Sequence, residues 1–242
     1  MIGLRYMHNV AAAFADVTAR IAVAAEGAGR NPRDVTLVAV SKTRTVDETQ
    51  AAIEAGARHL GENYIQELVD KHSALGLGPQ GDLQWHAIGH VQRNKVKYIT
   101  PFCGLIHSLD STRLADEINR RAVQADRVQG VLIQVNIARE DTKFGVAAGD
   151  AAQLAEHVCE LPNTQLRGLM SMTPYDISQD EARRHFAGLR ELSQRLAANL
   201  PEGAMQDLSM GMTQDYETAV QEGATLVRVG TAIFGARQNT HA

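Results

Sequence analysis

Eight short apolar runs alternate with amphipathic segments, and this alternation restricts the fold more than any other feature of the sequence. A plausible helix separates each pair of neighbouring runs. The predicted strands are residues 35–41, 59–62, 84–88, 105–108, 131–137, 166–171, 207–209 and 226–229. Strands that alternate with helices pair in parallel through right-handed crossovers. The pattern therefore predicts an α/β fold, a closed (β/α)8 TIM barrel, with an open doubly wound sheet as the alternative.

One further helix is predicted ahead of the first strand, over about residues 5–27, where an alanine-rich amphipathic pattern ends in glycines. The chain has 242 residues, of which 44% are hydrophobic and 21% charged, close to the average of a globular protein. No low-complexity linker divides it, and its length suits an undivided barrel. We therefore expect one domain, residues 1–242.

Two distant segments, 51–63 and 218–231, share a helix end, a Gly-Ala step, a short strand and a glycine. Gly56 and Gly223 in these segments suit the left-handed conformation that ends a helix. The similarity is a faint echo of one repeating unit, and it is consistent with a barrel.

Composition excludes several classes of partner. A formal net charge of -4 gives no general attraction for nucleic-acid phosphates or anionic lipid, so neither nucleic acid nor membrane is expected. No stretch approaches the roughly 18 uninterrupted apolar residues of a membrane-spanning helix, and no export signal is recognisable. The two cysteines, Cys103 and Cys159, form no C-x-x-C pair, which favours free thiols in a reducing compartment. We expect a cytoplasmic protein.

Several familiar motifs lack the structural context that they need. The G-x-G-x-x-G at 76–81 follows a predicted helix and leads into a strand, the reverse of a dinucleotide-binding loop. His86 and His90 are four residues apart, but WHAIGH is predicted to be a strand entering a glycine loop, so no metal site is expected. The chain contains neither G-x-S-x-G nor G-x-x-x-x-G-K-[ST], so hydrolase and nucleotide-kinase functions lose their usual support.

Lys42 ends the first predicted strand, in the stretch TLVAVSKT. The C-terminal ends of barrel strands converge on one mouth, where chemistry resides in such folds. Removal from bulk water lowers the pKa of a lysine there, and a neutral amine attacks an aldehyde to form an imine. The alternative is a lysine whose stem covers apolar surface while its amine reaches solvent. The other lysines fall in polar helical or loop contexts: Lys71, Lys95, Lys97 and Lys143.

The last two predicted strands end in steps that suit an anion. Ser209 ends one strand, and Gly230 and Thr231 follow the other at the start of a short turn or helix. Barrels commonly hold phosphate in these loops, where amides and hydroxyls donate to it. The alternative is that both steps are simple strand-to-helix turns. An aldehyde-reactive lysine combined with a phosphate site points to pyridoxal 5'-phosphate (PLP).

Seven ordered blocks resemble the pyridoxal phosphate homeostasis protein family over nearly the whole chain. They are AVSKT (39–43), GENYIQE (61–67), WHAIGHVQRNK (85–95), VLIQVNIAREDTKFG (131–145), LRGLMSM (166–172), LSMGMTQD (208–215) and VRVGTAIFGAR (227–237). The resemblance implies a barrel of PLP fold type III, like the N-terminal domain of alanine racemase. It also implies that Lys42 carries PLP as a covalent Schiff base and that Ser209, Gly230 and Thr231 hold the phosphate.

The same resemblance assigns further cofactor-binding residues. Arg228 would face the pyridine nitrogen, while Asn63, Met210 and Met212 would line the cofactor mouth. Thr213 stands where the family more often has serine, and it keeps a hydroxyl. An arginine opposite the ring nitrogen disfavours the protonated pyridinium and weakens the electron sink that racemases use.

We therefore expect no catalytic residues, and a protein that carries PLP and maintains intracellular vitamin B6 and amino-acid/keto-acid balance. In alanine racemase the second acid or base comes from a further domain, for which no counterpart is apparent before Ala242. PLP-dependent apo-enzymes are the expected transient recipients, and the resemblance favours a monomer. One alternative is a weak PLP-dependent amino-acid racemase, with Lys42 as one base and Tyr64 or His90 as the other. Another is a cofactor-free interaction module.

Overall fold

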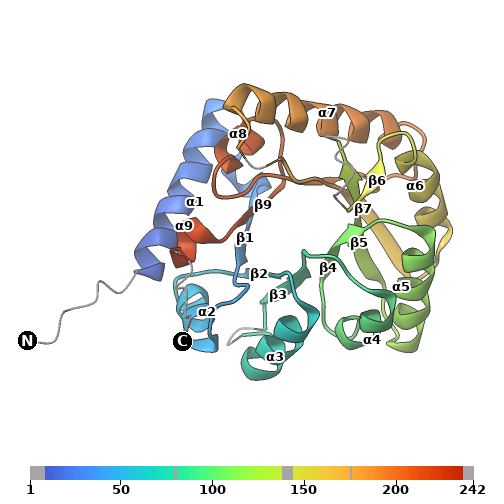
Figure 1. The fold of residues 1–242 in the computed structure, drawn as a ribbon, viewed down its shortest axis with the longest axis horizontal. Helices are drawn as coiled ribbons and strands as arrows, with labels where there is room; N and C mark the ends of the chain where they lie inside the picture. Colours follow the sequence, from blue (N-terminus) through green and yellow to red (C-terminus); the bar gives the residue numbers. More distant parts are fainter. Residues whose placement is uncertain (1–8, 79–80, 138–143, 175, 237–242) are drawn as a thin grey trace, which may run out of the picture.

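Eight parallel strands close into a barrel in the computed structural model, which describes residues 9–78, 81–137, 144–174 and 176–236 (Figure 1). The barrel strands are β1 (Thr36–Val40), β2 (His59–Glu62), β3 (Gln84–Ala87), β4 (Leu105–Leu109), β5 (Gln129–Asn136), β7 (Thr164–Met170), β8 (Asp207–Ser209) and β9 (Leu226–Val229). Each strand pairs with the next along the chain, and β9 returns to pair with β1. A short strand, β6 (Val146–Ala147), adds to β5 outside this ring. The predicted (β/α)8 barrel is confirmed.

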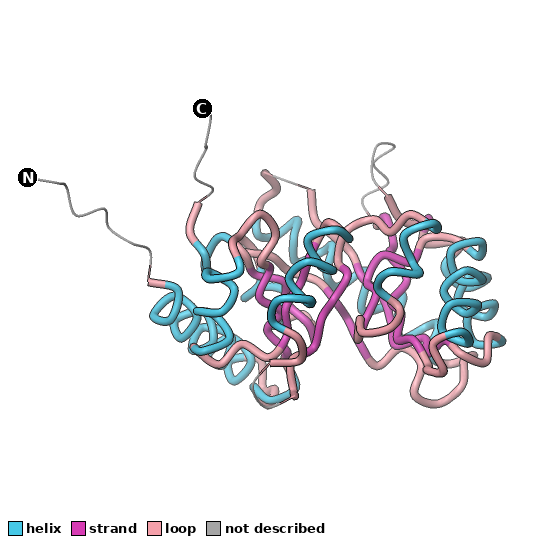
Figure 2. The backbone as a smooth tube through the Cα atoms, turned by 90° about the horizontal axis from the view of Figure 1, so that it is seen from below, coloured by secondary structure: helices cyan, strands magenta, loops and turns pink. Residues whose placement is uncertain are grey.

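Helices surround the strands on all sides (Figures 1 and 2). They are α1 (Val10–Gly27), α2 (Val46–Glu54), α3 (Ile65–Leu75), α4 (Val96–Ile99), α5 (Thr112–Gln124), α6 (Ala151–Glu160), α7 (Gln179–Ala197), α8 (Tyr216–Gln221) and α9 (Thr231–Phe234), with 3-10 turns η1 (Pro32–Asp34) and η2 (Arg93–Lys95). Two strands begin earlier than predicted, β5 at Gln129 and β7 at Thr164, because polar first residues mask the start of each apolar run.

Helix α1 precedes the barrel, as predicted, and packs against α2, α8 and α9 beside the junction of β1 and β9 (Figure 1). It begins at Val10 because the Asn9 side chain accepts a hydrogen bond from the N–H of Ala12 at 3.0 Å, as an N-cap does. The described helix therefore begins at Val10, and the predicted start at about residue 5 lies outside the described ranges. Arg30 fixes the connection to β1 by donating to the carbonyl oxygens of Val220 and Ala224.

Two apolar clusters form the core. The larger lies between the strands and the helices and includes Trp85 and Phe186, both fully buried. The smaller fills part of the barrel interior and consists of Val38, Leu105, Leu132, Met170 and Leu226. Burying one large aliphatic side chain contributes roughly 1.5–3 kcal/mol, so the larger cluster dominates stability. The small inner cluster leaves interior positions for polar side chains.

Glycines with positive φ confirm two of the predicted helix ends. Gly56 after α2 has φ of 108°, and Gly223 after α8 has φ of 103°. Gly76, the first glycine of the G-x-G-x-x-G stretch, follows α3 and accepts a hydrogen bond from Trp85 Nε1 at 2.8 Å through its carbonyl. This loop therefore joins a helix to a strand, as expected, and does not open a helix toward a dinucleotide.

Three findings concern the membrane span, the cysteine thiols and the metal site that were considered from the sequence. Among the described helices, none is long and apolar enough to cross a membrane. Cys103 and Cys159 are free thiols, and burial raises the pKa of Cys103 to about 11. Within the described ranges, no three histidine, cysteine or acidic residues form a group suited to a metal ion.

Candidate functional site

The C-terminal ends of the barrel strands form one mouth, and several of the predicted site residues lie around it. Val40 is in register with Gly61, so Lys42 and Asn63, each two residues beyond this pair, lie at the same height just after the ends of β1 and β2. A Cβ added to Gly230 would lie 3.2 Å from the carbonyl oxygen of Val40. The loop after β9 therefore passes directly against the end of β1. The structure brings the lysine turn and the glycine step together, although they are far apart in sequence.

A tight turn positions Lys42. The N–H of Arg44 donates to the carbonyl of Ser41 at 3.0 Å, which closes the turn around the half-buried Lys42. Thr43 has φ of 63°, the left-handed region that a β-branched residue avoids and that costs about 1–3 kcal/mol. Its N–H donates to Glu67 Oε2 at 2.7 Å, which supports this conformation.

A buried ionic cluster of Ser41, Glu62, Glu67 and Lys71 holds the other side of the turn. Lys71 Nζ donates to the carbonyl of Ser41 at 2.5 Å and to Glu62 Oε1 at 2.6 Å. Ser41 Oγ donates to the same carboxylate oxygen at 2.6 Å. Lys71 is only 4% exposed, so it is not the surface lysine that its polar helical context indicates. The peptide groups before and after Lys42 are thus held by two side chains of α3, Lys71 and Glu67.

Opposing effects act on the pKa of Glu62 in this ionic cluster. Burial raises the pKa of its carboxyl group, while the ammonium of Lys71 and the Ser41 hydroxyl oppose the rise. Its second oxygen, Oε2, is buried and has no hydrogen-bond partner among the described residues. A buried carboxylate with one satisfied oxygen depends strongly on its single ammonium partner.

Arg228 lies beneath the mouth and is 4% exposed. Its Nη1 donates to Ser209 Oγ at 2.5 Å, and its Nη2 donates to the carbonyl of Ser171 at 2.8 Å. Burial lowers the pKa of Arg228 to about 10, so the guanidinium stays charged at neutral pH. Ser171 Oγ is buried without a hydrogen-bond partner in the described part of the chain.

Ser209 is placed differently from its predicted role. It is completely buried, and its hydroxyl contacts Arg228 and, at 2.8 Å, His107 Nδ1. This geometry does not support the prediction that Ser209 holds a phosphate. Thr213, in the loop after β8, is half-buried, and its Oγ1 accepts from the N–H of Ala232 at 3.4 Å, in the first turn of α9. A hydroxyl beside Gly230 and Thr231 is therefore supplied by Thr213.

The two methionines of this loop also differ from each other. Met210 is completely buried in the larger apolar cluster, which does not support the prediction that it lines an open mouth. Met212 is half-buried, and its N–H donates to Asp215 Oδ1 at 2.7 Å. Asp215 in turn accepts from Thr173 Oγ1 at 2.6 Å, so the loops after β7 and β8 are joined at the rim.

The two side chains considered as a second base both lie on the rim. Tyr64 is 57% exposed. His90 stacks on Phe144, with ring centroids 4.3 Å apart, and its Nδ1 lies 3.4 Å from Asp110 Oδ2. The structure therefore assigns His90 to a contact between the loops after β3, β4 and β5.

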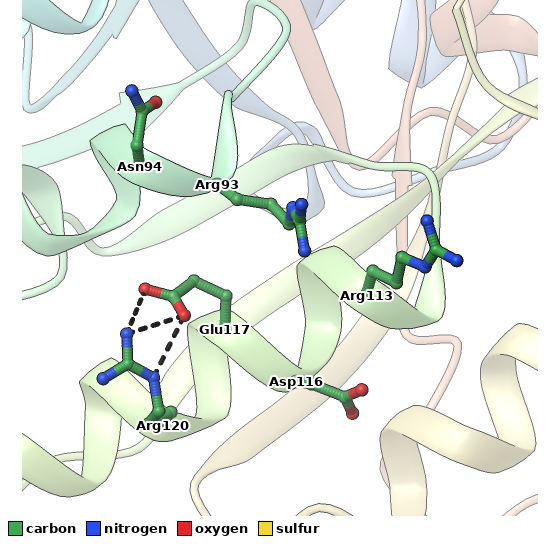
Figure 3. Close-up of a pocket in the computed structure, with 6 residues that line it drawn as sticks. All are labelled: Arg93, Asn94, Arg113, Asp116, Glu117 and Arg120. Carbon is green, nitrogen blue, oxygen red and sulfur yellow. Dashed lines mark hydrogen bonds and ion pairs between the residues drawn. The ribbon is translucent and has the colours of Figure 1, made fainter.

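A hollow of about 420 Å³ lies outside the barrel, between η2 and α5 (Figure 3). The side chains that line it are Arg93, Asn94, Arg113, Asp116, Glu117 and Arg120. Arg120 donates three hydrogen bonds to Glu117, at 2.7, 2.8 and 3.0 Å, so the positive charge of Arg120 is compensated within the hollow (Figure 3). The hollow contains none of the predicted cofactor residues and is too open to exclude water. We do not regard it as the site.

Comparison with known proteins places the chain in a family. The sequence profile of the alanine racemase N-terminal domain matches residues 15–238. The pyridoxal phosphate homeostasis protein of Aquifex aeolicus is 43% identical over 222 residues, which cover 92% of this chain and 96% of that protein. The protein of the same name from Escherichia coli K12 is 40% identical over 233 residues, 96% and 98% of the two chains.

Solved structures agree with this assignment. PipY of Synechococcus elongatus, determined with PLP bound, has a TM-score of 0.79 and 34% identity, and the match covers 90% of this chain and all of that one. Alanine racemase of Clostridium difficile has a TM-score of 0.70 at 13% identity over 93% of this chain and 61% of that one, which shows a shared fold alone. The chain therefore belongs to the pyridoxal phosphate homeostasis proteins, a family built on the alanine racemase N-terminal domain.

Proposed function

We propose that this chain binds PLP at the barrel mouth, carries it covalently on Lys42 and contributes to PLP and amino-acid/keto-acid homeostasis. The observation that carries the proposal is the position of Lys42, in a turn held by Glu67 and Lys71 directly after the end of β1, against which the Gly230 step packs. The names of the relatives at 40–43% identity and the PLP bound to PipY support it.

The residues at the mouth fit this cofactor. PLP supplies an aldehyde, which condenses with a primary amine and releases water. Lys42 would supply the amine. The first amides of α9 have no partner within the helix, and with the hydroxyls of Thr213 and Thr231 they would donate to the phosphate. Arg228, one layer below, would face the ring nitrogen, and Asn63 would border the site from β2.

Ser209 and Met210 take other roles in this proposal. Ser209 would act on the cofactor only through Arg228, because both partners of its hydroxyl lie beneath the mouth. Met210 would pack the layer behind the loop after β8. Gly230 and Thr231 keep their predicted place beside the phosphate, and Thr213 replaces Ser209 there.

A carrier is favoured over a racemase. The relatives at 40–43% identity are named homeostasis proteins, while the resemblance to alanine racemase is at 13% identity and concerns the fold. Because a guanidinium does not readily give up its proton to the ring, Arg228 would keep the pyridine nitrogen unprotonated and weaken carbanion stabilisation. We propose PLP-dependent apo-enzymes as transient recipients and a monomer as the working form.

Absorption and trapping of the cofactor test this function. Protein mixed with PLP is expected to absorb at about 420 nm, the usual region of a protonated Schiff base, and borohydride followed by peptide mass mapping should place the adduct on Lys42. Lys42→Ala should lose the band and keep the fold. The matched control is Lys97→Ala, which removes an exposed lysine and should change neither. An adduct on another lysine of the wild-type protein would contradict the proposal.

A second measurement separates carrier from racemase. The loaded protein is incubated with L-alanine in heavy water, and exchange at the alpha carbon is followed by NMR. We expect exchange no faster than with free PLP. Turnover well above that rate, lost in Lys42→Ala, would overturn the carrier assignment.

A further inference from the structure

Three histidines form a continuous line inside the barrel. His59, His86 and His107 come from the neighbouring strands β2, β3 and β4. His59 Nδ1 lies 2.9 Å from His86 Nε2, and His86 Nδ1 lies 2.9 Å from His107 Nε2. His107 Nδ1 lies 2.8 Å from Ser209 Oγ, which also accepts from Arg228. We call these five residues the histidine file.

The histidine file crosses the barrel interior. Strands β4 and β8 are not neighbours in the sheet, so a hydrogen bond between their inward side chains spans the inside of the ring. His86 is 4% exposed, and His107 and Ser209 are completely buried. His59, at the first position of β2, is half-buried and forms the open end. The file therefore connects the N-terminal side of the barrel with the arginine beneath the mouth.

The hydrogen bonds of the ring nitrogens exclude a metal site at the centre of the file. Both ring nitrogens of His86 and of His107 already take part in hydrogen bonds, which leaves no lone pair for a metal ion. A neutral imidazole has one donor and one acceptor nitrogen. Each central ring must therefore donate to one neighbour and accept from the other, and the file has a single direction.

Arg228 sets that direction. A guanidinium only donates, so Ser209 Oγ accepts from Arg228. Within the described residues the other contact of this oxygen is His107 Nδ1, which is the available acceptor for the hydroxyl hydrogen. His107 Nε2–H then donates to His86 Nδ1, and His86 Nε2–H donates to His59 Nδ1. The geometry assigns the Nε2–H tautomer to all three rings.

We propose that Ser209 and the three histidines are positioning residues, a one-way hydrogen-bond relay that fixes the Arg228 guanidinium beneath the cofactor ring. The inference rests on the proposed function, because a bound ring gives Arg228 its target. With Ser209 held by His107, and Ser171 O accepting from Nη2, the plane of the guanidinium is set by two directed bonds. Burial supports neutral rings, since it lowers the pKa of His86 to about 3 and that of His107 well below its usual value.

The first test uses the protein without cofactor. Two-bond proton–nitrogen correlation spectra of ¹⁵N-histidine-labelled protein report the tautomer of each ring, and single variants assign the signals. The expected result is Nε2–H at His59, His86 and His107 at pH 7.5. A proton on Nδ1 of His107, or a charged ring at His86, would overturn the relay whether or not PLP binds.

The second test interrupts the file. His107→Leu leaves the Ser209 hydroxyl without an acceptor, and His107→Asn places an amide oxygen near the former Nδ1 to restore it. We expect His107→Leu to raise the Kd for PLP about tenfold, as for one lost hydrogen bond, and to shift the pH midpoint of the visible band by about half a unit. His107→Asn should recover most of both changes. His185→Leu, a buried histidine on α7 outside the file, is the matched control and should alter neither.

The outcomes separate this inference from the proposed function. If wild-type protein forms no borohydride-trapped adduct on Lys42, the proposed function fails, while the tautomers are still measured in the cofactor-free protein. If the adduct forms and His107→Leu keeps the wild-type Kd and band midpoint, the relay fails alone. Should His107→Leu not fold, the His107→Asn variant and the wild-type tautomers decide the question.

Discussion

Two buried polar groups support the barrel mouth, and they differ in charge. The ionic cluster beside Lys42 pairs an ammonium with a carboxylate, Lys71 with Glu62. The histidine file connects three neutral histidine rings, through Ser209, to the Arg228 guanidinium. A charged pair fixes the turn firmly but leaves a buried charge when one partner is lost. The neutral rings of the file orient a side chain without this cost, because each ring needs only one donor and one acceptor and carries no charge. Strand β2 contributes to both groups.

The largest expected effect comes from breaking the ionic cluster. Lys71→Met leaves Glu62 buried without its ammonium, and we expect unfolding free energy to fall by about 3–5 kcal/mol in urea titrations. The double variant Lys71→Met/Glu62→Met removes both charges and should regain most of this loss. A single variant that loses less than about 1 kcal/mol would show that the pair is not desolvated as described.

Acid is expected to weaken the histidine file next. His86 has its pKa lowered to about 3 by burial, and in the unfolded chain a histidine titrates near 6.5. Between these values the unfolded state binds a proton that the folded state does not. Stability is therefore lost as pH falls below about 6.5, by about 1.4 kcal/mol per pH unit for His86. His107 contributes in the same direction.

The charges around the file oppose protonation. Burial is the main reason why the pKa of His107 is lowered, and positive charge on His86, Arg228, Arg167 and His59 lowers it further. Asp207 is occupied by Arg167 at 2.6 Å. Urea titrations from pH 7.5 to 5 measure the slope. His86→Leu should flatten it, and His157→Asn, on the outer surface of α6, should leave it unchanged. A wild-type stability that is constant over this range would mean that the rings titrate in the folded state as they do in the unfolded chain.

A smaller loss is expected where the loops after β2 and β3 meet. A Cβ on Gly89 would lie 2.3 Å from the carbonyl oxygen of Asn63 and 2.8 Å from its Cα, so Gly89→Ala must push two backbones apart. We expect a cost of about 1–3 kcal/mol and weaker PLP binding, because Asn63 follows the strand that both polar groups share. Gly149→Ala, where an added Cβ meets nothing within 4 Å, is the control. Equal stability of the two variants would refute the close approach.

The smallest expected effect is a gain. Thr43→Gly relieves the left-handed conformation after Lys42 and should stabilise the fold by about 1 kcal/mol, less the entropy that glycine loses on folding. We expect PLP binding to weaken slightly, because the turn that aims Lys42 becomes less restricted. Thr43→Ala keeps most of the strain and should show little gain in thermal unfolding. If Thr43→Gly is instead less stable than the wild type, the threonine side chain itself must stabilise the turn.

The strands and the place of Lys42 were predictable because they depend on local pattern. An apolar run that ends in a polar residue predicts both a strand and its C-terminal end, and β1 shows this directly. The N-cap Asn9 was missed, although asparagine is a residue type that begins helices. The depth of Lys71 was not predictable, since its i, i+4 pair with Glu67 is equally typical of an exposed helix face.

The histidine file was harder still to predict. Each ring occupies an inward position of its strand. The contact that connects the rings to Arg228, however, joins His107 to Ser209 across 102 residues of sequence. Such a contact depends on the registry of opposite barrel strands, which no local pattern encodes. The roles predicted for Ser209 and Met210 stay predictions. Neighbouring residues at a strand end point to opposite sides, so Ser209 lies inside the barrel and Met210 lies toward the helices.

The closure of β1 against β9 has a consequence for biosynthesis. The Gly230 step contacts the end of β1, two residues before Lys42, across this junction, and α1 docks on α8 and α9 beside it (Figure 1). Since chains emerge from the ribosome N-terminus first, the first helix and strand must wait for their partners until translation is almost complete. The barrel closes through contacts between segments that are far apart in the sequence, and such contacts form slowly. We therefore expect a nascent chain to become able to bind PLP only in the last step of folding, and chains truncated before β9 to be unable to bind it.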